Sequence, residues 1–430
     1  MNIALYTLKT LSYALTNPYS MLFLFVFGGY LYNQNRKTSL MQKMVVGEQI
    51  NSPFELTISQ IVMGIFGGVI GSLAMSYSGV MFFQNSAIEI LFLTSIFLMM
   101  VNPRLICFSY SGAILGGLSI INSLLIANGA VGIDIFRFDI TSLMTMVAIL
   151  HFVEGLLVMT DGSRGAIPIF AKMQDKIVGG FALKRYWALP VAIFILLNNN
   201  TMVVQGKGVP MPLWWPIIRT TIPQEFLKNA MVALLPFYAV LGYNTVTFSK
   251  TKEKKALTSG AYMIGYSVAL FLLAQLCSIN IVFQVIVVIF APLAHELMIR
   301  YQKFKEEKGE PKYVSDQGMK ILYVSQDSKA ALMKIESGDS LIEINGEPVE
   351  NEEDILNKLK EATGDILLKI KKESGKIREM LYSKETKGNT LGVVFVPKFI
   401  PKDRMVLKFN NEDFSEVLQK IKNKDKDGEE

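Results

Sequence analysis

The feature that most constrains this chain is a change in residue character near position 303. Up to residue 302 the sequence runs as long apolar stretches with short polar breaks, whereas charged residues are frequent from Lys303 onward. Hydrophobic residues make up 51% of the 430 positions, and the formal net charge is only +6. Apolar stretches of such length are typical of membrane proteins. The sequence therefore predicts a membrane domain over residues 1–302, followed by a small water-soluble domain.

The apolar stretches predict membrane-crossing helices, because a helix needs about 20 mostly apolar residues to cross a bilayer. The first stretch is short, so we expect eight spans, or nine if it also crosses, and residues 2–16 add an interfacial segment. The expected fold class is a polytopic α-helical membrane bundle. The candidate spans are 18–33, 57–82, 86–102, 105–126, 140–160, 178–198, 227–248, 258–278 and 280–300.

Lysine and arginine near the span ends indicate the orientation, because basic residues in short loops favour the cytoplasmic side. If every candidate crosses, five basic groups lie on the same side. They are Arg36, Lys37 and Lys43; Arg104; Arg164, Lys172, Lys176, Lys184 and Arg185; Lys250, Lys252, Lys254 and Lys255; and Arg300, Lys303, Lys305 and Lys308. The domain after the last group is therefore predicted to be cytoplasmic, on a multi-pass protein of the cell membrane.

Glycines recur at four-residue spacing in the second candidate span, as Gly64 with Gly68 and Gly67 with Gly71. Small residues at this spacing let helix backbones approach one another closely. Packing within one chain is the favoured interpretation. A dimer face is the alternative, and it leaves a homo-oligomer open.

The C-terminal domain, residues 313–398, is predicted to follow a charged linker at 303–312. Alternating apolar residues predict strands, and helical spacing predicts two helices. The strands are expected at 318–325, 340–346, 365–371 and 377–382, and the helices at 328–333 and 352–362. Asn345-Gly346 is a strong signal for a two-residue hairpin turn. The domain is thus a small α+β unit.

This order of elements, with Ser328-Lys-Ala-Ala331 and Ser337-Gly-Asp-Ser-Leu-Ile-Glu-Ile-Asn-Gly346, resembles bacterial PDZ domains. The resemblance implies a partly open β-barrel with two helices, circularly permuted, that binds the C-termini of peptides or proteins. A strand at 404–409, an amphipathic helix at 412–422 and a charged, disordered end are expected in the tail, residues 399–430.

PDZ domains bind a peptide as an added strand, and backbone amides of one loop hold its carboxylate. The resemblance places this loop near the end of the domain, at Thr390, Leu391, Gly392 and Val393. The helix at 352–362, with Ile355 and Leu359 on its apolar face, then forms the other wall of the groove. The alternative is that residues 391–396 only close the barrel.

The chain has two histidines, and each lies beside a glutamate in an apolar stretch: His151 with Glu154, and His295 with Glu296. Ionisable groups inside a membrane are costly and usually face the bundle interior or a cavity. A structural polar contact between helices is the favoured interpretation. A ligand or ion site and a proton path are the alternatives. The two cysteines, Cys107 and Cys277, are interpreted as packing residues, and no metal or cofactor is expected.

His295-Glu296 matches the start of the His-Glu-x-x-His motif of zinc proteases, but position 299 is isoleucine, so this helix lacks the second zinc ligand. A membrane metalloprotease is therefore disfavoured. The sequence also shows no phosphate-binding glycine loop, no serine–histidine–aspartate set and no basic strip of the kind that binds nucleic acid. We expect a protein that is not an enzyme and whose partners are proteins and the lipid bilayer.

The membrane domain carries short motifs at His151-Phe-Val-Glu-Gly155, Trp187-Ala-Leu-Pro190 and Trp214-Trp-Pro216. Together with the PDZ-like domain, these motifs resemble the MinJ family. The resemblance implies a scaffold of Gram-positive cell division, enriched at the septum and poles, that links DivIVA-like and MinD-like proteins. The alternative function is a transporter or membrane sensor that uses the His151/Glu154 and His295/Glu296 cluster, with the PDZ-like domain as a regulatory module.

Overall fold

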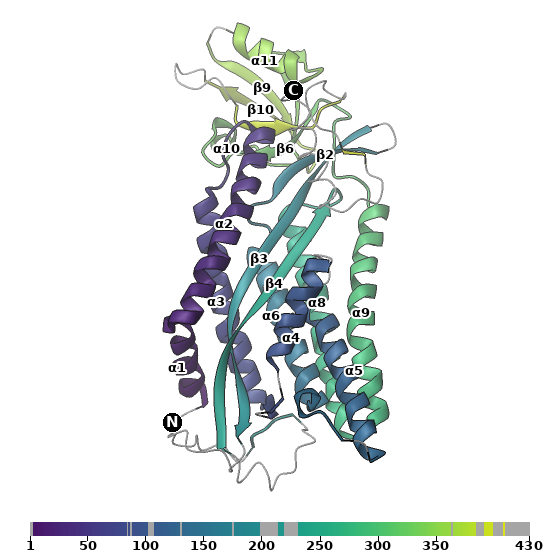
Figure 1. Ribbon diagram of the computed structural model, residues 1–430. Helices are drawn as coiled ribbons and strands as arrows, with labels where there is room; N and C mark the ends of the chain where they lie inside the picture. The colour runs from purple at the N-terminus through teal and green to yellow at the C-terminus, as the bar shows by residue number, and fades with distance from the viewer. Residues whose placement is uncertain are drawn as a thin grey trace, which may run out of the picture.

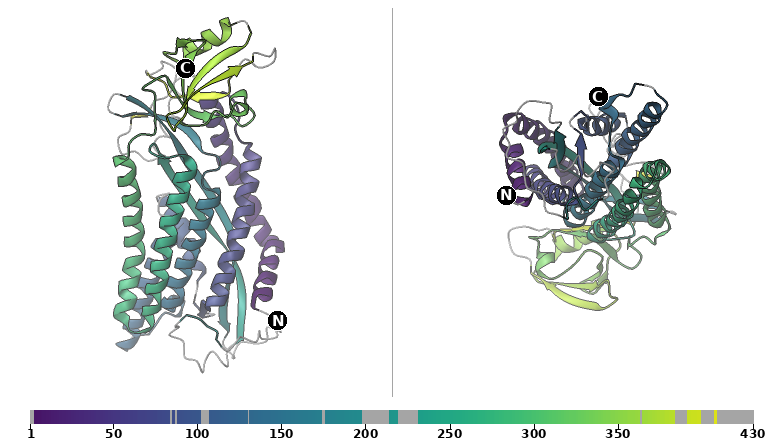
Figure 2. Two further views of the ribbon diagram at one scale, coloured as in Figure 1. Left: turned by 180° about the vertical axis from the view of Figure 1, so that it is seen from behind. Right: turned by 90° about the horizontal axis from the view of Figure 1, so that it is seen from below.

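In the computed structural model, an elongated helical block carries a small sheet domain at one end, and a long β-hairpin runs along the block toward that domain (Figure 1). The structure describes residues 3–83, 85–86, 88–101, 107–129, 131–173, 176–197, 214–218, 231–362, 364–383, 391–398 and 407–408. Helices α1–α3 lie on one side of the hairpin, and α5, α8 and α9 lie on the other (Figure 2).

Five helices in the described part of the chain are long and apolar enough to cross a membrane. The expectation of eight or nine spans is therefore not confirmed. The helix α4 has only 13 residues. The helix α2 has 29 residues, but it is not among the five. The helices are α1 (Ile3–Thr16), α2 (Pro18–Val46), α3 (Pro53–Ser78), α4 (Glu89–Val101), α5 (Phe108–Ala127), α6 (Ile140–Asp161), α8 (Lys252–Ala274) and α9 (Ile281–Lys308), with short 3-10 turns at Asp134–Phe136 and Gln275–Ser278.

The predicted spans 178–198 and 227–248 are wrong as helices, because the structure folds them into the hairpin. The strands β3 (Lys176–Leu197) and β4 (Met231–Thr247) pair antiparallel from Phe181↔Thr247 to Leu197↔Met231. With 22 residues, β3 extends about 70 Å at about 3.3 Å per residue. A proline inside each segment, Pro190 and Pro236, was the available signal against a helix.

Besides β4, short strands pair with β3 near each of its ends. Near its end, β1 (Met81–Phe83) pairs parallel with residues 194–196 of β3. Near its start, β2 (Ile167–Met173) pairs antiparallel with residues 176–182 of β3. A two-residue strand of the tail, β12 (Leu407–Lys408), adds parallel to β2. The helix predicted at 412–422 lies outside the described residues.

Between these short strands, one face of α3 packs directly on the backbone of β3. A Cβ atom built on Gly64 would lie 2.2 Å from the Ala188 carbonyl oxygen, and one on Gly68 would lie 2.2 Å from that of Pro190. One turn further, the backbone N–H of Ala192 donates to Ser72 Oγ over 3.0 Å. Four helical residues rise about 6.0 Å and two strand residues about 6.6 Å, so every fourth residue of α3 meets every second residue of β3.

The other two glycines of α3, Gly67 and Gly71, face the helix α6. A Cβ atom on Gly67 would lie 3.0 Å from Val153 and Leu157 of α6, and one on Gly71 would lie 3.3 Å from Val153. The glycine spacing therefore serves packing within one chain, as the sequence favoured. The face of α3 with Gly64 and Gly68 nevertheless packs on a strand, which the glycine spacing alone did not indicate.

A buried ion pair joins β3 to α6 and α3. Arg185 is 1% exposed, and its Nε donates to Asp161 Oδ2 over 2.9 Å. The same carboxylate accepts from Trp187 Nε1 over 2.9 Å, and the guanidinium also donates to Ser59 Oγ over 2.6 Å. The interpretation of Arg185 as a residue of a basic loop was wrong, because this side chain lies inside the protein.

The C-terminal domain has the elements that the sequence predicted. A five-stranded antiparallel path runs β10–β9–β7–β6–β11, and β8 pairs with β7. Asn345 and Gly346 both have positive φ in the β7–β8 turn, as a two-residue hairpin requires. The elements are β6 (Met319–Val324), α10 (Lys329–Leu332), β7 (Ser340–Ile344), β8 (Glu347–Pro348), α11 (Glu352–Glu361), β9 (Ile366–Lys371), β10 (Ile377–Tyr382) and β11 (Val393–Phe395).

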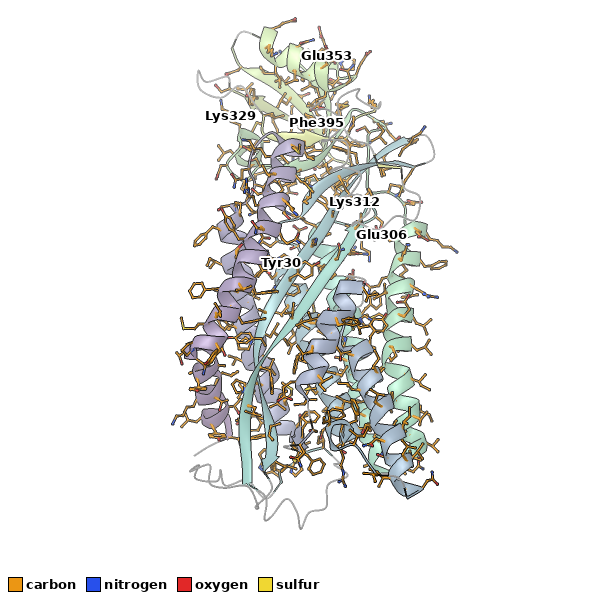
Figure 3. All side chains as sticks on the ribbon, in the orientation of Figure 1. Tyr30, Glu306, Lys312, Lys329, Glu353 and Phe395 are labelled. Atoms are coloured by element: carbon orange, nitrogen blue, oxygen red, sulfur yellow. The ribbon has the colours of Figure 1, made fainter. Side chains whose placement is uncertain are left out.

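The expectation of a charged linker at 303–312 is wrong, because α9 continues as a helix to Lys308. Glu306 forms a buried ion pair with Lys255 over 3.2 Å and accepts from the backbone N–H groups of Phe248 and Ser249 over 2.8 Å. Glu306 and Lys312 therefore lie where the helical block meets the sheet domain (Figure 3).

The sheet domain is tied to the hairpin directly. The strand β5 (Tyr313–Val314) pairs antiparallel with residues 178–179 of β3. The Tyr313 ring is fully buried and packs edge-on against Phe181, with 5.7 Å between ring centroids. This burial raises the pKa of Tyr313 to about 12. The two parts of the molecule thus share one core.

Candidate functional site

The segment predicted to bind a peptide carboxylate leads straight into an edge strand. The strand β11 is the last in the sheet path and pairs on one side with β6. The preceding loop is anchored to the start of α10, because Leu391 and Gly392 carbonyls accept from the N–H groups of Ala330 and Ser325, over 3.3 and 2.9 Å. Thr390 lies outside the described residues.

Gly392 meets two requirements that exclude other residues. Its φ of +73° lies in the left-handed region, and a Cβ atom there would lie 2.2 Å from Ser328 Cβ. The apolar-Gly-apolar pattern at residues 391–393 therefore has a local structural reason. It holds the loop against α10 and turns the chain into β11.

Ile355 and Leu359 of α11 do not face an open groove. They are 2% and 7% exposed, and they pack with Leu391, which is 4% exposed, in the core of the domain. This core includes residues of both α11 and the 391–393 loop. The assignment of these residues to peptide binding stays a prediction.

The histidines of the membrane domain meet around Cys107. The cysteine is the N-cap residue of α5, while His151 and His295 lie near the middle of α6 and α9. Cys107 Sγ lies 3.0 Å from His151 Nε2 and 3.5 Å from His295 Nε2, and the histidine ring centroids are 5.4 Å apart. We call Cys107, His151 and His295 the Cys–His cluster.

Neighbouring groups orient one ring of the Cys–His cluster. His151 Nδ1 lies 2.7 Å from the Val147 carbonyl oxygen, which can only accept, so the proton resides on Nδ1 and the Nε2 lone pair faces Cys107. Ser109 Oγ lies 3.1 Å from the same Nε2 and 2.8 Å from the Tyr266 hydroxyl. Tyr266 in turn donates to the Ala291 carbonyl oxygen over 2.8 Å.

The glutamates beside the histidines have different positions. Glu154 is 8% exposed and lies one helical turn from His151 on α6. Glu296 accepts from Arg300 Nε over 2.9 Å and from the Tyr110 hydroxyl over 3.1 Å, and its side chain is 40% exposed. The predicted four-residue cluster thus includes both histidines but has Glu296 at its margin.

The interpretation of the cysteines was right for one of them. Cys277 is fully buried in the apolar core of the helical block. Cys107 contacts two imidazoles, so packing alone does not describe it. Both thiols are free of disulfides. Sequence reasoning missed Cys107 because the helices that bring it to the histidines are far apart in the chain.

The comparisons with known proteins agree with both parts of the chain. A family model described as PDZ domain matches residues 303–371. The cell division topological determinant MinJ of Bacillus subtilis (strain 168) is 22% identical over 254 residues, which are 56% of this chain and 60% of MinJ. No solved structure gives a significant match. The chain is thus similar to MinJ at low identity, over 60% of the length of MinJ, and it carries a PDZ domain, as the sequence motifs indicated.

Proposed function

We propose that this protein is a non-enzymatic membrane scaffold that recruits a protein partner through its PDZ domain, in the placement of the division site. The observation that carries the proposal is the position of the 391–393 loop, which runs directly into β11 at the edge of the sheet. A bound C-terminus would extend the sheet beyond β11, with its carboxylate on the loop amides. The name of the relative, a cell division determinant, supports the process.

The proposed orientation places the PDZ domain in the cytoplasm and the protein at the septum and poles. Basic residues at the PDZ end of the molecule support it: Lys176 pairs with Asp316, Lys255 pairs with Glu306, and Lys312 pairs with Glu373. Arg104, which the sequence assigned to the same side, lies outside the described residues. MinD-like and DivIVA-like partners remain an expectation from the family resemblance.

The test uses the full chain with Gly392→Val, because the PDZ domain shares its core with the membrane domain. Valine at this φ, against Ser328, will distort the loop, so septal enrichment of a fluorescent fusion and binding of its C-terminal peptide ligand are expected to fall about tenfold or more. The control is Gly375→Val, which has a similar φ of +84° but no atom within 4 Å of its Cβ position.

The control variant carries similar backbone strain in an exposed turn, so it is expected to retain localisation and binding. Equal behaviour of the two variants, with both proteins present at normal levels in the membrane, would remove the loop from the function. Uniform membrane fluorescence of the unaltered protein through division, with normal cell length in a deletion strain, would remove the division role.

A transporter or sensor is the second candidate function, and one observation favours it. His151 and His295 of the Cys–His cluster are buried near the middle of their helices, where ionisable groups are costly. For a scaffold, His151→Gln should leave septal localisation unchanged if the protein folds. A transporter or sensor should lose flux or signalling with the same change.

A further inference from the structure

The Cys–His cluster brings together three of the few histidine and cysteine side chains in the protein. The protein has two histidines and two cysteines in 430 residues. Both histidines and one cysteine meet here from three helices that are far apart in sequence. Their ligand atoms, one Sγ and two ring nitrogens, all lie within 4.8 Å of one another. Thiolate and imidazole are the donors that zinc and copper(I) prefer, whereas magnesium and calcium prefer oxygen.

The distances suit one ion held by all three groups. A tetrahedral ion with a metal–sulfur bond of about 2.3 Å and metal–nitrogen bonds of about 2.0–2.1 Å places sulfur and nitrogen about 3.5 Å apart. Cys107 Sγ lies 3.0 and 3.5 Å from the Nε2 atoms of His151 and His295. The Val147 carbonyl holds the proton of His151 on Nδ1, which leaves Nε2 as the ligand atom.

The His295 ring is buried, and one of its two nitrogens is directed at Cys107. This side chain is 4% exposed, yet its Nδ1 atom has no hydrogen-bond partner in the described part of the chain. Its Nε2 atom lies 3.5 Å from Cys107 Sγ, so Nε2 is the atom that an ion held by Cys107 would bind.

The local charge also fits a divalent ion. Glu154 lies one turn from His151 and is buried. The Cys107 thiolate offsets one of the two charges of a divalent ion, which lowers the cost of holding that ion inside the membrane. The argument against zinc at His295, that the same helix lacks a second ligand, no longer applies, because α5 and α6 supply the other two.

We propose that Cys107, His151 and His295 form a binding site for a thiophilic divalent transition-metal ion, with zinc as the first candidate. Three protein ligands leave a fourth coordination position for water or another small donor. The proposal concerns metal binding in the membrane domain and is independent of the PDZ domain.

The test measures metal in the full-length protein, purified in detergent with zinc and then freed of loose metal by a weak chelator. We expect about one zinc ion per chain, as for other sites of three protein ligands. We also expect a thiolate-to-metal charge-transfer band when cobalt(II) replaces zinc. Cys107→Ser, His151→Gln and His295→Gln should each lower zinc affinity by at least about tenfold.

Two matched variants serve as controls. Cys277→Ser changes the other buried cysteine, and Glu296→Gln changes the residue next to His295; both should keep the zinc content and the cobalt band. The cobalt spectrum of the unaltered protein needs no variant, so the test holds even if a cluster variant fails to fold. Absence of a thiolate band, or equal zinc in the unaltered protein and Cys107→Ser, would overturn the proposal.

Discussion

Replacing Arg185 with methionine is expected to lower the free energy of unfolding by about 3–5 kcal/mol, because the change leaves the Asp161 carboxylate buried without its buried counter-charge. Both side chains are almost fully buried, at 1% and 3% exposure. Trp187 Nε1 and Ser59 Oγ still donate to the carboxylate, and the half-exposed Arg164 lies 3.5 Å from it, but neutral donors and an exposed cation do not replace a buried guanidinium. Unfolding of the full chain in mixed micelles, titrated with a denaturing detergent, measures the difference.

The control for this prediction lies in the same strand. Lys176 pairs with Asp316 over 2.9 Å, but these side chains are 63% and 64% exposed. Lys176→Met should therefore change stability by no more than about 1 kcal/mol. The double variant Arg185→Met with Asp161→Asn removes both charges and should recover part of the loss. Equal stability of Arg185→Met and Lys176→Met would show that the Arg185–Asp161 pair does not hold β3 to α6.

The second large effect is expected at the contact between α3 and β3. Gly64→Ala and Gly68→Ala should each destabilise the protein by about 2–3 kcal/mol, since the added methyl group would lie 2.2 Å from a backbone carbonyl oxygen. A backbone oxygen cannot rotate away as a side chain can, so the helix and the strand must separate. The same unfolding measurement, with the oligomeric state recorded in parallel, tests this prediction.

Gly117 and Gly265 provide the comparison, because nothing lies within 4 Å of a Cβ atom built at either position. Alanine there should be neutral or stabilising by up to about 1 kcal/mol, since alanine has the higher helix propensity. If Gly64→Ala matched Gly117→Ala in stability and instead dissociated a dimer, the glycines would serve a contact between chains.

The PDZ domain was largely predictable because its signals are local. The Asn345-Gly346 turn, the alternation in 340–344 and the helical spacing in 352–361 each specify their element within a few residues. The 391–393 loop was also found from its pattern. Its close approach to Ser328 and the shared core of Ile355, Leu359 and Leu391 were not predictable, since they join distant segments.

In the membrane domain, local sequence patterns did not predict the β3–β4 hairpin. By length, an apolar run of about 20 residues favours a membrane-crossing helix, because strands of that length are uncommon. Pro190 and Pro236 opposed the helix, but a proline also occurs inside α9, at Pro292. The choice of strand depends on β3 and β4 pairing with each other, which is a property of two segments together.

The sequence by itself determined the division into an apolar block and a PDZ domain, the elements of that domain, and the presence of two histidines in apolar surroundings. Only the tertiary structure decided that two apolar runs form a hairpin, that Arg185 is buried, and that Cys107 lies between His151 and His295. The reason is physical. Turns and amphipathic faces are set by neighbours along the chain, whereas strand pairing, charge burial and ligand convergence are set by groups that meet only after the chain has folded.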